Sequence, residues 1–362
     1  MRKLALLIGI VGLAVGLGTA SSWAVPSGVV DNTAFVDPEN GTDSSTCGGE
    51  SLSVAAQGPC RTLNQGLNNI SSGGTIYITK GGIFGALLIQ LPVSIIGPAG
   101  QPAVISYDGG NPGCVGGSPG SCNGFNVSFY AVDIEAPGAT VKFKNVVISN
   151  TESTLNPALH VGGAFNVSLD KVSIRVGGGT IPEMLLIDSS QGAPLQLYLY
   201  DCDIGFSSSG GGISVAPSGN TPVSVSISNS QFHNATFGIQ AVATSLTGGA
   251  GIAMAIDNTQ FYAFNNSALS VVATSSGDGA SVALVRSNIL NTGGAALKIN
   301  GAGASVTLNE TAITHSSAGV NLLNGGTGST YQNNQISNNG TNCEISGAST
   351  PCSAVLTSQP QN

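Results

Sequence analysis

A unit of alternating apolar residues recurs along most of the chain and limits the folds that it can adopt. In Val223-Ser-Val-Ser-Ile-Ser-Asn-Ser-Gln-Phe232, apolar residues alternate with serine, shift phase at a two-residue bend, and resume at Phe232. The residue equivalent to Phe232 is large and apolar in every copy, at Ile148, Ile174, Ile204, Phe232, Phe261, Ile289, Ile313 and Ile336, with intervals of 23 to 30 residues. A repeat of this length with period-2 alternation predicts a solenoid.

Each repeat contains three short strands. A bend separates the first two, and a third strand, such as Ile239–Val242 or Leu297–Ile299, follows after about seven to twelve residues. This pattern predicts an all-β fold, a right-handed single-stranded parallel β-helix in which each strand pairs with its counterpart about 4.8 Å away in the next coil. With the Phe232 equivalent numbered 0, side chains at −7, −5, −2 and 0 are expected to point into the core.

The first 24 residues have the pattern of a secretory signal peptide. Arg2 and Lys3 precede an apolar run, and Ser22-Trp-Ala24 has the small-x-small form of a cleavage site. The run is too short for a membrane span, so we expect export, with no membrane span after signal cleavage.

The rest of the chain divides by composition. Residues 25–73 are expected to form an N-terminal segment with a short amphipathic helix, N-capped by Thr62, that covers the open edge of the first coil. Residues 74–346 are predicted to form the β-helix, with regular coils from about residue 139. Residues 347–362 read as a polar C-terminal tail with no obvious amphipathic cap.

Charge excludes some partners. Only 8% of residues are charged, and the formal net charge is −8 at pH 7. An acidic chain poor in lysine and arginine lacks the electrostatic footprint of a protein that binds nucleic acid. High hydrophobicity with 52 glycines is also unlike disorder, and it suits short buried strands joined by sharp turns.

The N-terminal part of the chain resembles a known family. The motifs that carry the resemblance are Phe35-Val-Asp-Pro38, Gly41-Thr-Asp43, Pro59-Cys-Arg-Thr-Leu63, Gly74-Thr-Ile-Tyr-Ile78 and Ser94-Ile-Ile-Gly97. They resemble the opening of secreted right-handed parallel β-helix proteins of the pectin-lyase-like superfamily over residues 34–105, and the coil repeat extends the resemblance to about residue 345. It implies a periplasmic, secreted or cell-surface protein. It leaves activity open, because the superfamily includes polysaccharide lyases, glycoside hydrolases, adhesins and proteins of no assigned activity.

Six of the seven cysteines lie in neighbouring pairs. Sequence alone does not fix connectivity, but each pair encloses a short loop, and we expect the disulfides Cys47–Cys60, Cys114–Cys122 and Cys343–Cys352. Disulfides imply an oxidising compartment. The remaining Cys202 occupies an inward −2 position and is predicted to be a buried, inert thiol.

Two columns of polar residues follow the turns. Stacked bends are expected to form exposed ion pairs between coils, each worth about 0–1 kcal/mol, at Lys144–Asp170, Lys171–Asp201 and Arg286–Glu310. Asparagine tolerates left-handed turns and hydrogen-bonds to its counterpart in the next coil. An asparagine ladder is therefore expected at +2, at Asn150, Asn234, Asn291 and Asn338, with His315 in the same column.

The densest polar-aromatic cluster lies around the third coil, and its candidate binding residues are Tyr198, Tyr200, Asp201, Asp203, Lys171 and Arg175, with His233 nearby. Exposed rings supply stacking surface for sugars, and acids share proton transfer or hold a cation. The alternative interpretation is a solvated strand face with ion pairs. His160, between inward Leu159 and Val161, is expected to face solvent, and three scattered histidines predict no metal site.

Two classes of function fit these features. The first is a non-catalytic secreted β-helix that is surface-structural, adhesive or glycan-binding, with polysaccharide or a cell-surface glycan as partner and no cofactor. The second is a polysaccharide lyase or glycoside hydrolase acting on an extended acidic polysaccharide at the third-coil cluster, where Ca²⁺ becomes relevant. The Asn-Thr-Asp, Asp-Asp, Gly-His-Gly and Arg-Ile-Lys signatures of polygalacturonase-like hydrolases do not occur, so no catalytic residue is assigned. Self-association through exposed faces is a third hypothesis.

Overall fold

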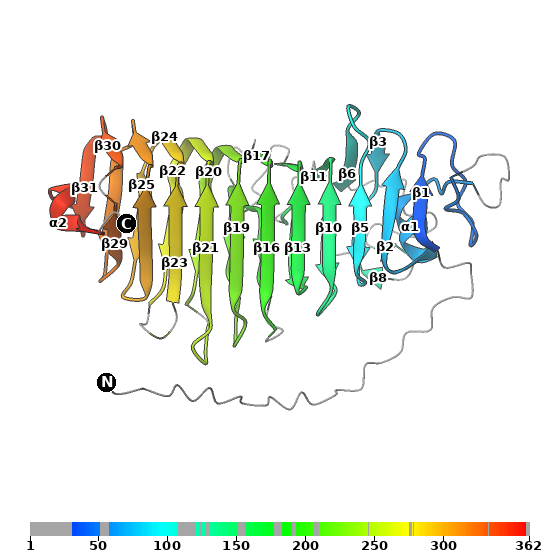
Figure 1. Ribbon diagram of the computed structural model, residues 1–362, viewed down its shortest axis with the longest axis horizontal. Helices are drawn as coiled ribbons and strands as arrows, with labels where there is room; N and C mark the ends of the chain where they lie inside the picture. Colours follow the sequence, from blue (N-terminus) through cyan, green and yellow to red (C-terminus); the bar gives the residue numbers. More distant parts are fainter. Residues whose placement is uncertain are drawn as a thin grey trace, which may run out of the picture.

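The alternating repeat forms the coils of a parallel β-helix in the computed structural model (Figure 1). The structure describes residues 31–50, 58–107, 121–122, 125–126, 130–150, 156–176, 183–189, 193–205, 210–244, 246–274, 277, 279–331 and 333–359. The predicted signal peptide, residues 1–24, lies outside these ranges.

One face of the solenoid is a parallel sheet, here called sheet A, whose strands lie side by side along the long axis of the molecule (Figure 1). Within the described residues it contains twelve strands, in the order β1 (Asp31–Val36), β2 (Ile70–Ile78), β5 (Val93–Ile96), β10 (Thr140–Lys144), β13 (Asn166–Asp170), β16 (Leu195–Tyr200), β19 (Val223–Ser228), β21 (Gly251–Asp257), β23 (Gly279–Val285), β26 (Ala304–Asn309), β29 (Thr327–Thr330) and β33 (Leu356–Ser358).

The other faces belong to a second sheet, sheet B, built from two rows of strands. One row contains β3 (Gly82–Phe84), β6 (Ala103–Tyr107), β11 (Val146–Asn150), β14 (Ser173–Val176), β17 (Asp203–Gly205), β24 (Asn288–Thr292), β27 (Ala312–Thr314) and β30 (Gln335–Ser337). The other, the third-strand row, contains β4 (Leu87–Ile89), β9 (Val132–Glu135), β12 (Leu159–Gly163), β15 (Glu183–Ile187), β18 (Gly211–Val215), β25 (Ala295–Asn300), β28 (Ala318–Leu323) and β31 (Thr341–Ile345). The long strands β20 (Gln231–Val242) and β22 (Gln260–Val272) belong to both rows.

The predicted repeat register is confirmed at position 0. Each residue of this column pairs with its counterpart in the next coil, from Ile148 opposite Ile174 to Ile313 opposite Ile336. The rings of Phe232 and Phe261 stack in the core with centroids 5.0 Å apart. The core is therefore a continuous column in which each coil buries its apolar residues against the next.

Polar residues at −2 are buried without loss of hydrogen bonds. The hydroxyl of Ser230 accepts from the backbone N–H of Cys202 in the preceding coil (3.1 Å) and donates to the carbonyl of Ser228 in its own coil (2.9 Å). Ser287 makes the same two bonds, accepting from Thr259 N at 3.1 Å. A buried hydroxyl with both partners satisfied costs little, which explains how serine and threonine occupy an inward column.

The bend at −3 requires a left-handed backbone. Positive φ values of 47° to 54° occur even at charged residues, including Lys171, Asp201, Arg286 and Glu310. A hydrogen bond between side-chain amides of neighbouring coils lies in this column, where Asn258 Nδ2 donates to Asn229 Oδ1 at 2.6 Å. The left-handed turn predicted at +2 is confirmed at Asn234, Asn291, His315 and Asn338. Asn150 differs, because it lies inside β11, is buried, and donates to the carbonyl of Asn156.

Ion pairs between coils follow the prediction in two of three cases. Lys144 and Asp170 approach to 2.6 Å, and Lys171 and Asp201 to 3.8 Å. The predicted Arg286–Glu310 pair is wrong, because Arg286 turns toward the preceding coil and pairs with Asp257 at 2.5 Å. The arginine side chain is long enough to reach either neighbouring coil, and the sequence does not decide which of the two it contacts.

Both ends of the solenoid are covered. The predicted helix is α1 (Leu63–Asn69), with Thr62 Oγ1 accepting from Gln65 N, and the Cys47–Cys60 disulfide lies beside it. At the other end, the Cys343–Cys352 disulfide is confirmed. The tail continues through β32 (Ala348–Ser349), antiparallel to β31, and α2 (Cys352–Val355), and adds β33 to sheet A.

Two cysteine predictions remain, the buried Cys202 and the Cys114–Cys122 disulfide. Cys202 is a free, buried cysteine, as predicted, and burial raises the pKa of its thiol to about 12. The predicted Cys114–Cys122 disulfide lies outside the described residues, because Cys114 is not among them. Cys122 belongs to β7 (Ser121–Cys122), which pairs antiparallel with β8 (Phe125–Asn126).

No helix among the described segments is long and apolar enough to cross a membrane.

Candidate functional site

The predicted third-coil residues lie on two faces of the solenoid. Tyr198 and Tyr200 alternate with core leucines on β16 of sheet A and point outward, with 42% and 50% of their surface exposed. The Tyr198 hydroxyl donates to Gln196 Oε1 at 3.1 Å, so both side chains lie on the same surface. These rings form an exposed aromatic platform on sheet A.

The charged members of the cluster lie around the bend and on sheet B. Lys171 and Asp201 pair on the exposed bend. Arg175 approaches Asp203 Oδ2 at 3.2 Å, and His233 Nε2 approaches Asp203 Oδ1 at 2.8 Å. Asp203 is thus held by two neighbours on sheet B. The structure therefore brings Arg175, Asp203 and His233 together but places the tyrosines on the adjacent sheet.

A groove of about 470 Å³ runs along the outer face of sheet A, where five neighbouring strands begin. Its floor consists of small side chains at the starts of β19, β21, β23 and β26, namely Ser224, Ala253, Ser281 and Ser305. Gln196 on β16 lies at one end, next to the Tyr198 platform. Five strands at about 4.8 Å spacing give the groove a length of about 19 Å. It is thus an extended surface parallel to the solenoid axis.

Sequence reasoning did not predict this groove, although its signal is present. The outward residues at the starts of these strands are all small, while the equivalent residue in the third coil is Gln196. A row of small outward residues beside larger ones marks a channel once the strand register is known. The register of β16, β19 and β21 supplies that information.

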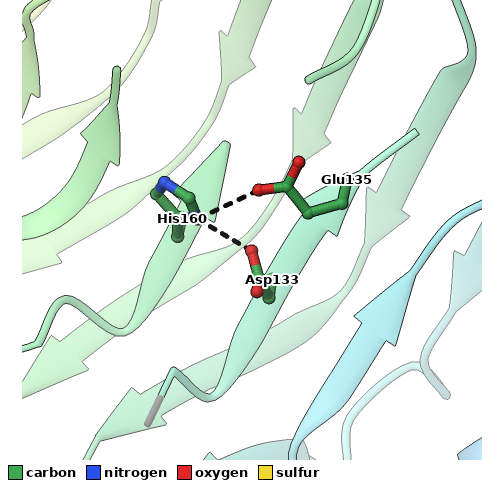
Figure 2. Close-up of side chains that lie close together, drawn as sticks. All are labelled: Asp133, Glu135 and His160. Carbon is green, nitrogen blue, oxygen red and sulfur yellow. Dashed lines mark hydrogen bonds and ion pairs between the residues drawn. The ribbon is translucent and has the colours of Figure 1, made fainter. Parts of the chain in front are cut away.

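A second candidate site lies on the third-strand row. Asp133 and Glu135 alternate with core residues on β9, and His160 lies opposite Asp133 on β12 of the next coil. His160 Nδ1 is 2.7 Å from Asp133 Oδ1 and 3.9 Å from Glu135 Oε1. Figure 2 shows both carboxylates directed toward the same side of the imidazole. On its other side, His160 Nε2 is 2.8 Å from Asp188 Oδ1. One imidazole is therefore surrounded by three carboxylates.

The imidazole is also covered. Tyr130 stacks on it with ring centroids 4.5 Å apart, and His160 is only 7% exposed. The expectation that His160 faces solvent is therefore wrong. The side chain points away from the core, as the alternation requires, but Tyr130 and the carboxylates of neighbouring coils cover it.

Burial and hydrogen bonding shift the titration of this cluster in opposing ways. Burial alone lowers the pKa of His160, but the hydrogen bonds to Asp133 and Asp188 outweigh it and raise the pKa from 6.5 to about 9. Burial, followed by repulsion from Asp188, raises the pKa of Glu183 to about 7. Burial, and to a smaller extent repulsion from Asp133, raises the pKa of Glu135. Near neutral pH the His160 ring is thus an imidazolium.

Asp133, Glu135 and His160 also form the only group of three or more metal-donor side chains within the described residues whose donor atoms lie within 4.8 Å of one another. Sequence reasoning considered a cation only at the acids of the third-coil cluster and predicted no metal site from the three histidines, so it missed this group. The signal that was available is Asp133-Ile-Glu135 one coil before Leu159-His-Val161, both in the third-strand row.

No model of a known protein family matches this sequence, and no curated protein is detectably similar to it. The fold and the described residues therefore define the class of protein, a parallel β-helix with an elongated groove on one face and an acid–histidine cluster on another.

Proposed function

We propose that this protein is a secreted, non-catalytic parallel β-helix that binds an extended glycan along sheet A. The observation that carries the proposal is the groove, which spans four strand spacings or about 19 Å and ends beside the exposed Tyr198 platform. An elongated floor suits a linear polymer better than a small compact ligand.

The chemistry of the surface supports a carbohydrate. Exposed tyrosine rings offer flat apolar faces on which pyranose C–H groups stack, and their hydroxyls hydrogen-bond. Ser224, Ser281 and Ser305 offer hydroxyls along the floor, with Gln196 at one end. The groove lining contains no charged residue, so we expect a neutral or weakly charged polymer.

Secretion is supported by the signal-like residues 1–24 and by the two disulfides, Cys47–Cys60 and Cys343–Cys352. We propose membership of the pectin-lyase-like superfamily on the resemblance over residues 34–105 and on the β-helix fold. The lyase or hydrolase alternative needs the tyrosines and the acids in one groove. We favour binding because Asp203 and Arg175 pair with each other on sheet B.

A panel of neutral and acidic polysaccharides tests this function. Affinity electrophoresis of the purified protein should show retardation by at least one polymer, with no new reducing ends and no unsaturated products after prolonged incubation. Depolymerisation that Asp203→Ala abolishes would replace the proposal with the catalytic alternative. Absence of retardation by every polymer would remove glycan binding.

A further inference from the structure

The acid–histidine cluster on the third-strand row has the composition and spacing of a metal site. Three donor atoms, one each from Asp133, Glu135 and His160, lie within 4.8 Å of one another. They come from two paired strands in neighbouring coils, β9 and β12, in which His160 lies opposite Asp133 and a register shift at Gly162 places Glu135 opposite Gly163. Rigid strands hold such donors more accurately than loops do.

The distances suit an ion between the donors. Bonds of about 2.1 Å from a metal to nitrogen and oxygen place adjacent donors about 3.0–3.4 Å apart and opposite donors about 4.2 Å apart. His160 Nδ1 lies 2.7 Å from the Asp133 oxygen and 3.9 Å from the Glu135 oxygen, values on either side of the spacing of about 3.0–3.4 Å expected for adjacent donors. Small side-chain rotations let all three atoms reach one ion.

The surroundings of His160 prepare Nδ1 for this role. A metal-binding histidine usually donates its other ring N–H to a carboxylate, which fixes the tautomer and the ring orientation. Asp188 takes that place at Nε2, 2.8 Å away. Tyr130 stacks on the ring and fixes its plane. Asp188 and Tyr130 lie outside the donor set and thus support it independently.

Gly162 supplies the space for the third donor. A Cβ atom at this position would collide with the Glu135 carboxylate, which lies across the Gly162 backbone, and would approach His160 Cε1 at 3.0 Å. Gly162 lies within β12 and does not have a left-handed φ, so the backbone conformation itself does not demand glycine. The missing side chain instead lets Glu135 reach toward His160.

We propose that Asp133, Glu135 and His160 bind a divalent first-row transition metal ion of the Zn²⁺ class, with Asp188 as the positioning residue for His160. The ion takes the place of the Nδ1 proton, which is released to solvent on binding. Imidazole nitrogen favours Zn²⁺ over Ca²⁺ and Mg²⁺, which prefer oxygen donors only. The carboxylates outnumber the single imidazole and supply the compensating negative charge.

Calorimetry on the whole protein tests the site. The protein is purified without a histidine tag, treated with a chelator, dialysed into metal-free buffer and titrated with ZnCl₂ and, separately, CaCl₂. We expect one equivalent of Zn²⁺ to bind and Ca²⁺ to bind at least tenfold more weakly. His160→Gln and Glu135→Gln should each weaken Zn²⁺ binding at least tenfold, and Asp188→Asn by about 10- to 100-fold.

Two further variants separate binding from folding. Gly162→Ala should keep the thermal midpoint close to wild type, because the clashing atom belongs to a flexible side chain, yet weaken Zn²⁺ binding at least tenfold. His233→Gln removes another carboxylate-paired histidine and should leave Zn²⁺ affinity unchanged. The X-ray absorption spectrum of the Zn²⁺-loaded protein should contain imidazole scattering that His160→Gln removes. No stoichiometric Zn²⁺ binding, tighter binding of Ca²⁺, or unchanged affinity in His160→Gln would each overturn the proposal.

Discussion

Replacing Phe261 with alanine is expected to lower the free energy of unfolding by about 4 kcal/mol. Phe261 is 1% exposed, stacks on Phe232 in the preceding coil, and lies in register with Ile289 in the following one. Its removal therefore loses the transfer energy of a large ring and leaves a cavity in a rigid stack of strands that collapses poorly. Urea unfolding followed by circular dichroism measures the change.

The matched control is Leu290→Ala, one residue after position 0 in the next coil. Leu290 is 39% exposed on the outer face of sheet B, so the expected change is within about 0.5 kcal/mol. Equal effects of Phe261→Ala and Leu290→Ala would contradict the assignment of inward and outward positions. Because that assignment places every candidate site residue, the comparison tests more than one side chain.

Raising the pH from 7 to 9.5 is expected to lower the free energy of unfolding of the metal-free protein by about 1–2 kcal/mol through His160. This value already includes a reduction for solvent screening, because Asp188, one of the two carboxylates hydrogen-bonded to His160, is half exposed. The pKa of His160 is raised from 6.5 to about 9. A raised pKa means that its stabilisation is fully present below pH 6.5 and is lost as the pH rises through 9. Urea midpoints measured in chelator at several pH values give the slope.

Two groups near this cluster, Glu183 and Tyr130, titrate mostly outside this window. The pKa of Glu183 is raised to about 7, so its own effect falls mostly between pH 4.5 and 7, and that of Tyr130 is raised above 10. Asp133, Glu135 and Asp188 are the remaining acids around the ring. His160→Gln should remove most of the slope between pH 7 and 9.5, and His233→Gln should retain it. A wild-type slope in His160→Gln would show that the ion pairs of His160 do not stabilise the fold.

The core was predictable from the sequence because the repeat is local. Alternation within each unit assigns Ile148, Phe232 and Phe261 to one inward column, and parallel stacking then fixes their neighbours. Short loops also made the pairing of Cys47 with Cys60 predictable. Each of these inferences needs only spacing along the chain.

The candidate sites were less predictable because they depend on what covers an outward residue. Alternation correctly turns His160 away from the core, but Tyr130 and Asp188, which cover it, come from other coils. The choice of Arg286 between Asp257 and Glu310 depends on a side-chain rotamer. The groove on sheet A needs the register of five strands at once. The repeat period and the spacing of residues along the chain do not determine these side-chain contacts between coils.

The most direct test of the proposed function is to fill the groove. Ala253 lies at its centre, on β21, and its outward position tolerates a large side chain without disturbing the core. Ala253→Trp is compared with Gln260→Trp, an exposed outward position on sheet B. Tyr198→Ala is added to remove the aromatic platform, where a stacking contact of about 1 kcal/mol corresponds to about a fivefold change.

The decisive measurement is the dissociation constant of these variants for the polysaccharide that retards the wild-type protein, read from the same affinity electrophoresis. We predict that Ala253→Trp abolishes retardation, that Tyr198→Ala weakens it severalfold, and that Gln260→Trp matches wild type. Wild-type affinity in Ala253→Trp, or equal losses in both tryptophan variants, would contradict glycan binding along sheet A.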